Sequence, residues 1–419
     1  MALLPIDEAA GTWRAPGRRM DGTFRLLATG DFCPTDTSPV CAAFLRGREA
    51  AKAVYGDTLS ELRAKDLSVT NLELPLDLGG APTIKSGPCM HAPPEAVEGL
   101  LAGGFDMACL ANNHMLDYGD APLLATLDLL AERGIAAAGA GANLEAARVP
   151  AVLERAGRRV GVLSIAEHEY NPATRTEAGI APLEPGTNAA DIARLRPDVD
   201  LLIVFVHGGN EHCPFPSPRA VREYRSLIDA GADAVIGHHA HCPQGMELHN
   251  GRPILYNLGN FLFWKPADQC PYLWLESFFA RLYFDGRDFV GLDVHPYRLD
   301  AETARLGLLG GEERTAFLRR LNRISGIVAD PAEHERFWNA YALSGWAHYR
   351  GLVEKYVPRM DSDDDHTARD AACILRNMYT CQAHRDRIVT ALELMRLGRD
   401  REPFGVEEEL AELRGKEER

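Results

Sequence analysis

The feature that most constrains the fold is a regular alternation of strand-like and helix-like segments between Phe24 and about Asp300. Apolar runs such as FRLLATGD, LSVTNLE and VDLLIVFVHGG are separated by segments with helical spacing, such as PPEAVEGLLAGG and SPRAVREYRSLIDAG. The first of these helical segments begins with proline and ends with glycine, as helices prefer. Strands that alternate with helices predict an α/β sheet with helices packed against it.

The pattern changes after Met246, where signals for β-hairpins replace the alternation. Asn250-Gly251 lies between two apolar runs, and this dipeptide is a strong signal for a tight β-turn. The runs ESFFARLYF and FVGLDVHPYRL, separated by DGRD, predict another antiparallel pair. We therefore expect a second sheet to join the first.

The last part of the chain shows only helical periodicity, from about Ala301 onward. This includes a long helical stretch from Thr367 to Leu397. We therefore expect three parts, namely an N-terminal segment at residues 1–22, an α/β domain at 23–300 and a helical C-terminal region at 301–419.

Composition and charge exclude several classes of partner. The chain has 45 Lys and Arg against 60 Asp and Glu, a formal net charge of −15, whereas nucleic-acid binding needs a basic face. The N-terminal apolar stretch is short and is followed by Asp7 and Glu8, unlike a secretory signal, and no run reaches transmembrane length. Nine cysteines without a CxxC pair are typical of reduced cytosolic thiols. We expect a cytoplasmic protein with no nucleic-acid or membrane partner, whose oligomeric state the sequence leaves open.

Polar residues at five strand ends are the strongest indication of function. In chain order, these ends carry Asp31, then Asn71 and Glu73, then Asn112, Asn113, His114 and Asp117, then His207 to Glu211, and finally Gly237 to His241. The carboxyl ends of strands in an open α/β sheet form one crevice. Carboxylates, amide oxygens and imidazoles suit a divalent metal of the Mn, Fe, Zn or Ca kind, and about six ligands can hold two ions. The sequence therefore predicts a two-metal site.

The order GD…NLE…NNHxxDYG…HGGxE…GHHxH…YNLGNF, between Leu26 and Phe263, resembles the CapA (PgsA-like) family. That family is named for poly-γ-glutamate capsule synthesis and is similar to the calcineurin-like metallophosphoesterases. The resemblance implies a four-layer α/β/β/α sandwich, here with a C-terminal helical extension. It also implies that His114 is the catalytic histidine, with Asp117 able to orient its imidazole. The metal ligands implied by the resemblance are Asp31, Glu73, Asn113, His207, His239 and His241.

Two positions depart from the pattern of ordinary metallophosphoesterases. Their first motif is Asp-x-His, whereas here Asp31 is followed two residues later by Cys33, a thiol in place of the imidazole. Glu73 stands where those enzymes have Asp. In the GHHAH motif, both His238 and His239 remain candidates for the ligand. These departures count against ordinary phosphatase activity.

Three enzymatic functions compete for this site. Phosphoester hydrolysis would use two metals to polarise the phosphate and His114 to protonate the leaving oxygen, but the motifs hold no Arg or Lys to clamp a phosphate. A capsule role would favour an exported or anchored chain, and the acidic surface would repel polyglutamate. We favour the third, Cα epimerisation of a peptide, because a cytosolic branch that resembles CapA inverts the C-terminal tryptophan of lasso-peptide precursors. A metal-stabilised binding protein without turnover is the non-enzymatic alternative.

Epimerisation places definite demands on the site. The Cα proton must leave one face and return to the other, so two acid/base groups should flank the carbon, while a metal stabilises the developing charge. His114 is one candidate. The second is His295 in GLDVHPYRL, which strand alternation places on the face opposite Leu292 and Val294. Weaker candidates are Asp31, Glu211 and His212. The expected partner is a precursor peptide, and we expect the C-terminal helices to wall the crevice that receives it.

Overall fold

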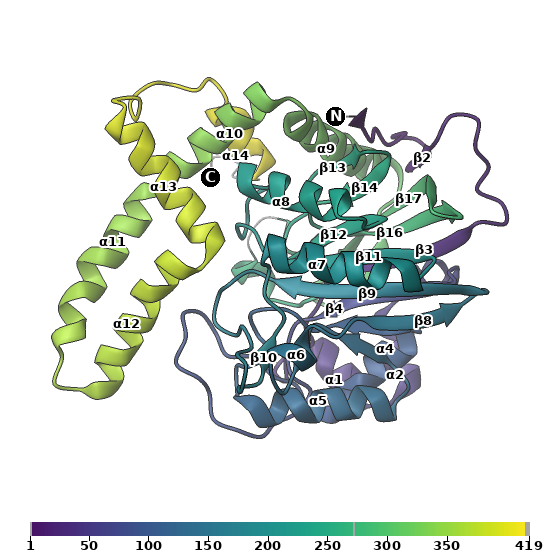
Figure 1. Cartoon of the computed structure of the whole chain (residues 1–419), viewed down its shortest axis with the longest axis horizontal. Coiled ribbons are helices and arrows are strands. Elements are labelled where there is room, and N and C mark those ends of the chain that lie inside the picture. The colour runs from purple at the N-terminus through teal and green to yellow at the C-terminus, as the bar shows by residue number, and fades with distance from the viewer. Residues whose placement is uncertain (1, 271–272, 415–419) are drawn as a thin grey trace.

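The computed structural model describes residues 2–270 and 273–414, and its body consists of two facing β-sheets with helices on both outer sides (Figure 1). The first sheet has the strand order β1 (Ala2–Leu3), β13 (Met246–His249), β14 (Arg252–Leu255), β12 (Ala234–His238), β11 (Leu201–His207), β9 (Arg158–Ala166) and β8 (Ala151–Arg155). The second has the order β18 (Leu306–Leu308), β17 (Asp288–Leu299), β16 (Glu276–Asp285), β3 (Phe24–Phe32), β4 (Leu67–Leu72), β5 (Met107–Cys109) and β6 (Ala136–Ala138). Two further strands pair with this sheet at its margins, β15 (Asn260–Leu262) with β3 and β2 (Thr12–Arg14) with β17. A small separate sheet pairs β7 (Ala140–Gly141) with β10 (Gly179–Ile180).

The predicted hairpins are present, but they do not form a sheet of their own. The β13–β14 hairpin turns at Asn250 and Gly251, which have φ of 51° and 74°, and it extends the first sheet beside β12. The β16–β17 hairpin instead pairs with β3 in the second sheet. The first sheet therefore has parallel strands at its centre and an antiparallel pair towards each margin. The second sheet is antiparallel from β18 to β3 and parallel from β3 to β6. A second sheet is present as expected, but the late strands are divided between the two sheets, because strand pairing across a sheet is not encoded in local periodicity.

Helices cover the outer face of each sheet, which completes the predicted four-layer α/β/β/α sandwich. An apolar core between the sheets includes Leu26, Ile203 and Phe278. The second sheet is covered by α1 (Pro39–Leu45), α2 (Arg48–Val54), α3 (Thr58–Arg63), α4 (Val97–Gly103) and α5 (Asp120–Glu132). The first sheet is covered by α6 (Leu144–Ala147), α7 (Pro185–Leu195), α8 (Pro218–Asp229), α10 (Pro331–Ser344) and α14 (Glu407–Leu413). Helix α9 (Gly311–Ala329) contributes to the core between the sheets and to the core beneath this last group of helices.

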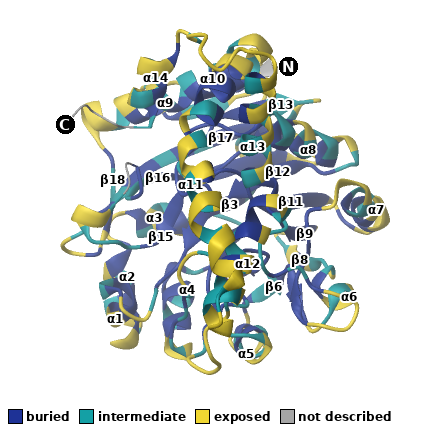
Figure 2. Cartoon of the chain, turned by 90° about the vertical axis from the view of Figure 1, so that its left-hand side faces the viewer, coloured by how far each residue is buried: buried dark blue, intermediate teal, exposed yellow. Residues whose placement is uncertain are grey.

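Three further helices form an arm at the left of Figure 1, namely α11 (Trp346–Tyr356), α12 (Asp365–Thr380) and α13 (Gln382–Arg396). Tyr349, Leu375 and Met378 form a small apolar cluster that holds these helices together. Figure 2 looks onto this side of the molecule and shows the arm in front of the strands of the sandwich. The helical stretch predicted from Thr367 to Leu397 is interrupted, because Cys381 adopts an extended conformation between α12 and α13.

The termini of the sandwich extend further than expected. Residues 1–22 include the two short strands β1 and β2, which pair with β13 and β17. Strand β18 pairs with β17, although only helices were expected after Ala301. The predicted helix from Glu49 to Lys65 is divided into α2 and α3 near Gly56, whose φ is 52°. In the described part of the chain, no helix combines the length and the apolar character needed to span a membrane.

Candidate functional site

The polar strand ends of both sheets meet at one edge of the sandwich. In the second sheet, Asp31 pairs with Asn71 where β3 and β4 end, and the Glu73 N–H donates to the Phe32 carbonyl at 3.0 Å. In the first sheet, β11 and β12 run parallel and place His207 directly beside His238. The His239 N–H donates to Asp31 Oδ2 at 3.2 Å, which joins the two sheets at this point.

A glycine explains how the chain segments approach so closely here. A Cβ atom on Gly30 would lie 1.8 Å from the Gly259 carbonyl oxygen, so no larger residue fits before Asp31. The Asp31 N–H donates to the same Gly259 carbonyl at 3.0 Å. The glycines of the GD and LGN motifs thus allow β15 to approach the end of β3, which places Asn260 close to the metal-binding side chains.

The side chains of the predicted ligands form two overlapping groups. Glu73, His207 and His239 each offer a ligand atom within 4.8 Å of the others, and so do Asp31, Glu73 and His241. Glu73 Oε1 lies 3.8 Å from His207 Nε2 and 3.9 Å from His241 Nε2. Because Glu73 belongs to both groups, it has the position of a carboxylate that bridges two metal ions.

The burial of Glu73 and the lack of a partner for its Oε1 atom in the described part of the chain show that these residues fit such metals. The Oε1 atom is buried and has no hydrogen-bond partner among the described residues. Burial and the adjacent Asp31 carboxylate raise the pKa of Glu73 well above its usual range. A buried carboxylate beside another carboxylate is costly unless a cation compensates both. A divalent ion bound to Oε1 would supply that charge.

His207 and His241 are in the form that binds metals. Burial, together with the neighbouring imidazole of His239, lowers the pKa of both His207 and His241 well below the usual range. A neutral imidazole carries the free lone pair that a metal needs. His241 Nδ1 lies 2.9 Å from Asn260 Oδ1, which fixes the orientation of the ring as outer partners of metal-binding histidines do. The side-chain amide of Asn113 completes the set, with Oδ1 3.1 Å from His207 Nε2.

The structure distinguishes the two adjacent histidines of the GHHAH motif. His238 Nε2 lies 3.0 Å from the Thr29 carbonyl, and its ring stacks on Phe205 in the interior. His239 belongs to the first ligand group. The backbone φ of His239 is 91°, and that of His241 is 55°. Such values are strained for residues with a Cβ and are found preferentially at functional sites.

Cys33, at the position where a metal-binding histidine was expected, does not belong to either ligand group. Its thiol is buried, 3.6 Å from the Glu73 carbonyl oxygen and 3.8 Å from Met90 Sδ. Burial and the nearby carboxylate of Glu73 raise the pKa of this thiol well above its usual value. Asp31, Glu73 and His241 therefore form a candidate ligand group in which Cys33 takes no part.

His114 and Asp117 form a buried pair beside the cluster. His114 Nδ1 lies 2.7 Å from Asp117 Oδ2, so Nε2 is the ring nitrogen left available for proton transfer. Asp117 also accepts hydrogen bonds from the Met90 N–H, at 2.7 Å, and from Lys85 Nζ. Burial, with the positive charge of Lys85 nearby, lowers the pKa of His114. A neutral, oriented imidazole at this position is suited to act as a general base.

A cavity of about 270 Å³ opens above His114 and His239. One side of it belongs to the sandwich and includes Lys85, Glu169 and Glu211. The other side consists of the end of α10 and the arm, and contributes Tyr341, His348, Tyr349, Asn377, Cys381, His384 and Arg387. The C-terminal helices therefore wall the cavity above the candidate metal centre. The arrangement of the arm in Figures 1 and 2 agrees with this placement.

Arg387 is a cationic residue of the cavity wall that the motifs did not indicate. Its guanidinium donates to the Tyr341 carbonyl at 3.0 Å and lies 3.9 Å from the centre of the Tyr341 ring. A Cβ atom on Gly345 would lie 2.1 Å from Arg387 Cζ, so this glycine leaves the space that the guanidinium occupies. The motifs did not indicate Lys85 either, because it lies in a loop without periodicity. No signal in the sequence alone connects either residue to the strand ends.

The structure does not bring His295 to the cavity. Its ring stacks on Phe279 with centres 4.8 Å apart, and Nδ1 lies 4.0 Å from Glu61 Oε2 on α3. Strand alternation does separate it from Val294, which faces the core between the sheets. However, α3 covers the opposite face of β17 at this point. His295 therefore contacts α3 and does not reach the cavity, where a second base was expected. Of the weaker candidates, Glu211 lines the cavity, and His212 packs on the ring of His241.

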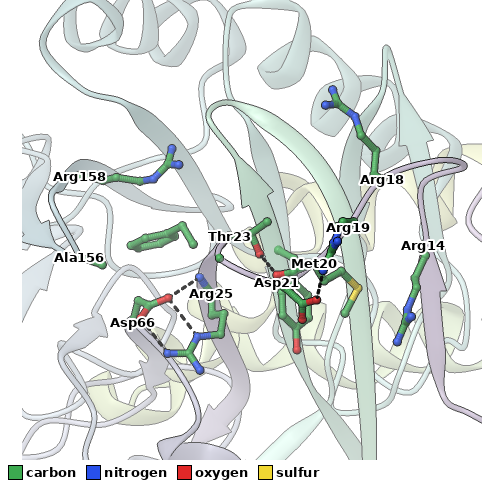
Figure 3. A pocket seen from close by; sticks show the side chains of 13 residues that line it. Arg14, Arg18, Arg19, Met20, Asp21, Thr23, Arg25, Asp66, Ala156 and Arg158 are labelled. Atoms are coloured by element: carbon green, nitrogen blue, oxygen red, sulfur yellow. Dashed lines mark hydrogen bonds and ion pairs between the residues drawn. The ribbon is translucent and has the colours of Figure 1, made fainter.

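A larger cavity, of about 790 Å³, lies at the other end of β3 (Figure 3). Its lining includes Arg14, Arg18, Arg19, Arg25 and Arg158, and it contains none of the predicted ligands. Seven residues of extended chain, about 23 Å, separate its Phe24 from Asp31. Arg25 is paired with Asp66 and Arg18 with Asp288. This cavity is therefore separate from the candidate metal centre.

These features define an α/β/β/α sandwich with candidate metal-ligand groups and a buried His–Asp pair beside them. Residues 25–265 match the sequence profile of the family described as bacterial capsule synthesis protein PGA_cap, and the chain belongs to this family. All six predicted ligands, His114 and Asp117 lie inside the matched segment.

Several curated proteins are similar to part of the chain. Capsule biosynthesis protein CapA of Bacillus anthracis is 31% identical over 180 residues, which cover 42% of this chain and 44% of that protein. A probable polyglutamine synthesis accessory protein of Mycobacterium tuberculosis is 34% identical over 222 residues, which cover 49% of this chain and 58% of that protein. The matched segment thus spans about half the length of these relatives. Among solved structures, a 5'-nucleotidase precursor from Thermus thermophilus aligns with a TM-score of 0.41 and 15% identity, covering 73% of this chain and 59% of that one.

Proposed function

We propose that the chain is a metal-dependent enzyme that inverts the Cα centre of the C-terminal residue of a ribosomally made peptide, such as a lasso-peptide precursor ending in tryptophan. The observation that carries the proposal is the cavity in which His114 and the ligand residue His239 face a wall built by the C-terminal helices. That wall, from Tyr341 to Arg387, lies outside the segment shared with the family. The predicted ligands therefore lie within the matched segment, whereas this wall of the cavity lies beyond it.

The chemistry of the wall supports a peptide C-terminus as the ligand. The guanidinium of Arg387 can form a charge-assisted hydrogen bond with a terminal carboxylate. Tyr341 and Tyr349 both line the cavity, so a tryptophan side chain bound there would lie beside aromatic residues. The cavity, of about 270 Å³, is suited to one large residue rather than to a long segment of chain.

The reaction removes the Cα proton from one face and returns a proton to the other, so the composition of the peptide is unchanged. When bound, the metals would supply Lewis-acid stabilisation of the negative charge that develops on the neighbouring carbonyl or carboxylate. His114 Nε2, with the ring held by Asp117, accepts or returns the proton on one side. Glu211, a carboxylate at the cavity, takes the place of His295 as the group for the other side.

Phosphoester hydrolysis is the second candidate, and one observation favours it. The motifs alone hold no cation to clamp a phosphate, but Lys85 and Arg387 both line the cavity beside His114. Lys85 is engaged with Asp117, so Arg387 is the cation better placed to contact a phosphate. His114 would then protonate the leaving oxygen.

Isotope exchange separates these functions. The full chain, supplied with Mn²⁺ or Zn²⁺, is incubated in D₂O with a synthetic peptide that ends in tryptophan, and the C-terminal Cα is examined for deuterium by mass spectrometry. We expect deuterium with the free carboxylate and much less with the amidated peptide. His114→Gln should abolish exchange, whereas His295→Gln should leave it unchanged. Phosphate release from an aryl phosphate, without exchange, would instead support the phosphoesterase, and absence of both activities would support a binding protein.

A further inference from the structure

A second set of metal-ligating side chains lies at the cavity, outside the cluster described above. Glu169, Cys381 and His384 each offer a ligand atom, and these atoms lie within 4.8 Å of one another. All three residues line the cavity. Glu169 follows β9 in the sandwich, whereas Cys381 and His384 lie at the start of α13. The set therefore spans the junction between the sandwich and the arm.

The backbone on both sides of this junction is firmly held. The His168 N–H donates to Gln382 Oε1 at 2.8 Å, and the Ala383 N–H donates to Glu167 Oε2 at 3.1 Å. These two hydrogen bonds join the two residues that precede Glu169 to the first turn of α13. The carboxylate of Glu169 is thus presented to Cys381 and His384 by a pre-organised scaffold rather than by chance contact.

Each of the three side chains is in a position to act as a ligand. Cys381 is 3% exposed and lies at the amino end of α13, where backbone N–H groups favour a thiolate. Burial by itself raises the pKa of this thiol, and a coordinating metal reverses that effect by deprotonating it. The Tyr349 hydroxyl lies 2.9 Å from His384 Nδ1, which orients the ring as an outer partner of a metal ligand does. The carboxylate of Glu169 makes no hydrogen bond to any other described residue.

We propose that Glu169, Cys381 and His384 bind a third divalent ion, of the zinc class, that fastens the arm to the sandwich. Thiolate, imidazole and carboxylate are the donors that zinc prefers. Bonds of about 2.0–2.3 Å place tetrahedral donors about 3.3–3.8 Å apart, so the observed spacing needs only a small side-chain adjustment. Three protein ligands leave a fourth position open towards the cavity, and the proton of the thiol passes to solvent as the metal binds. The donor set supports this site whether or not the reaction proposed above takes place.

Cobalt substitution tests the site without any substrate. The full chain is stripped with a chelator and reloaded with Co²⁺, and its absorption is recorded in the region of thiolate-to-cobalt charge transfer. Because the main cluster has only oxygen and nitrogen donors, such a band reports on Cys381. We expect the band in the unmodified chain and its loss in Cys381→Ser. The matched control is Cys373→Ser, a thiol on α12 that contacts the Ile84 carbonyl.

Two further variants complete the test. His241→Ala should lose metal at the main cluster and keep the charge-transfer band, which separates the two sites. His384→Gln should weaken the band and lower zinc content by one ion per chain, with circular dichroism used to verify folding, so the test does not rest on Cys381 alone. A Co²⁺-loaded chain without the band, or a band that survives Cys381→Ser but not Cys373→Ser, would overturn the proposal.

Discussion

The buried pair of Lys85 and Asp117 allows a direct test of how the acid/base residues are held in place. Asp117→Asn keeps the size of the side chain but removes its charge. The Lys85 side chain is 3% exposed and the Asp117 side chain is fully buried, so the ammonium would remain in the interior without a counterion. His114 Nδ1 would also lose the carboxylate that lies 2.7 Å away.

The structure sets the size of the expected effect. Asp117 accepts hydrogen bonds from Lys85 and the Met90 N–H and lies against His114, and an amide cannot satisfy all three. Removing one partner of a buried ion pair costs about 3–5 kcal/mol, because an uncompensated charge is left behind. Lys85→Met should cost a similar amount for the same reason. The double variant removes both charges, so its cost should fall below the sum of the single costs by about 2–3 kcal/mol.

Urea unfolding of the four proteins, followed by tryptophan fluorescence in the presence of a chelator, measures this coupling energy. The chelator ensures that bound metal does not contribute to the free energy of unfolding. The exposed ion pair between Glu49 and Lys52 is the matched control, and Glu49→Gln should leave the free energy of unfolding almost unchanged. If the losses of the two single variants simply add in the double variant, the reasoning about a coupled buried pair is refuted.

Three other predictions concern the predicted metal ligands, the cavity wall and His295. Glu73→Gln should release metal from both positions of the main cluster, as measured by elemental analysis after gel filtration, and unchanged metal content would contradict its bridging position. Gly345→Ala should displace Arg387 and raise KM for the free-carboxylate peptide about tenfold, with stability retained. Gly351→Ala, where a Cβ meets nothing within 4 Å, is its control, and equal KM values would count against the carboxylate contact. His295→Gln should leave metal content and turnover unaltered, and a loss of turnover would return His295 to the reaction.

Part of the convergence of the predicted ligands could be inferred from the sequence because it depends on a local rule. Each of Asp31, Glu73 and His207 lies at or just after the carboxyl end of a parallel strand. Parallel strands of one sheet present these ends at the same edge, which brings Asp31 and Glu73 together in the second sheet. The approach of His207, which ends a strand of the first sheet, follows from how the two sheets pack against each other and not from strand order. Sequence reasoning could not predict which of His238 and His239 turns towards the cluster, because that depends on the backbone strain at His239.

The residues that sequence reasoning missed depend on tertiary packing. His295 lies on the face of β17 that alternation predicts, but the covering of that face by α3 cannot be read from a strand pattern. Lys85 reaches Asp117 from a loop, and Arg387 reaches the cavity from a helix more than a hundred residues beyond the last motif. Hydrophobic periodicity indicates which side of a helix or strand faces the core. It does not indicate where two segments that are distant in the sequence come into contact.

The positions of these residues along the chain bear on how far the family's name can be extended to this protein. The six predicted ligands lie within residues 25–265, which the family shares, whereas the side chains from Tyr341 to Arg387 lie beyond it. Metal ions activate many kinds of oxygen centre, so the shared residues constrain the type of chemistry more than the substrate. The cavity wall decides which molecule can place a carbonyl or a phosphate near His114. The substrate of this chain therefore has to be sought in the chemistry of the cavity wall that its arm contributes.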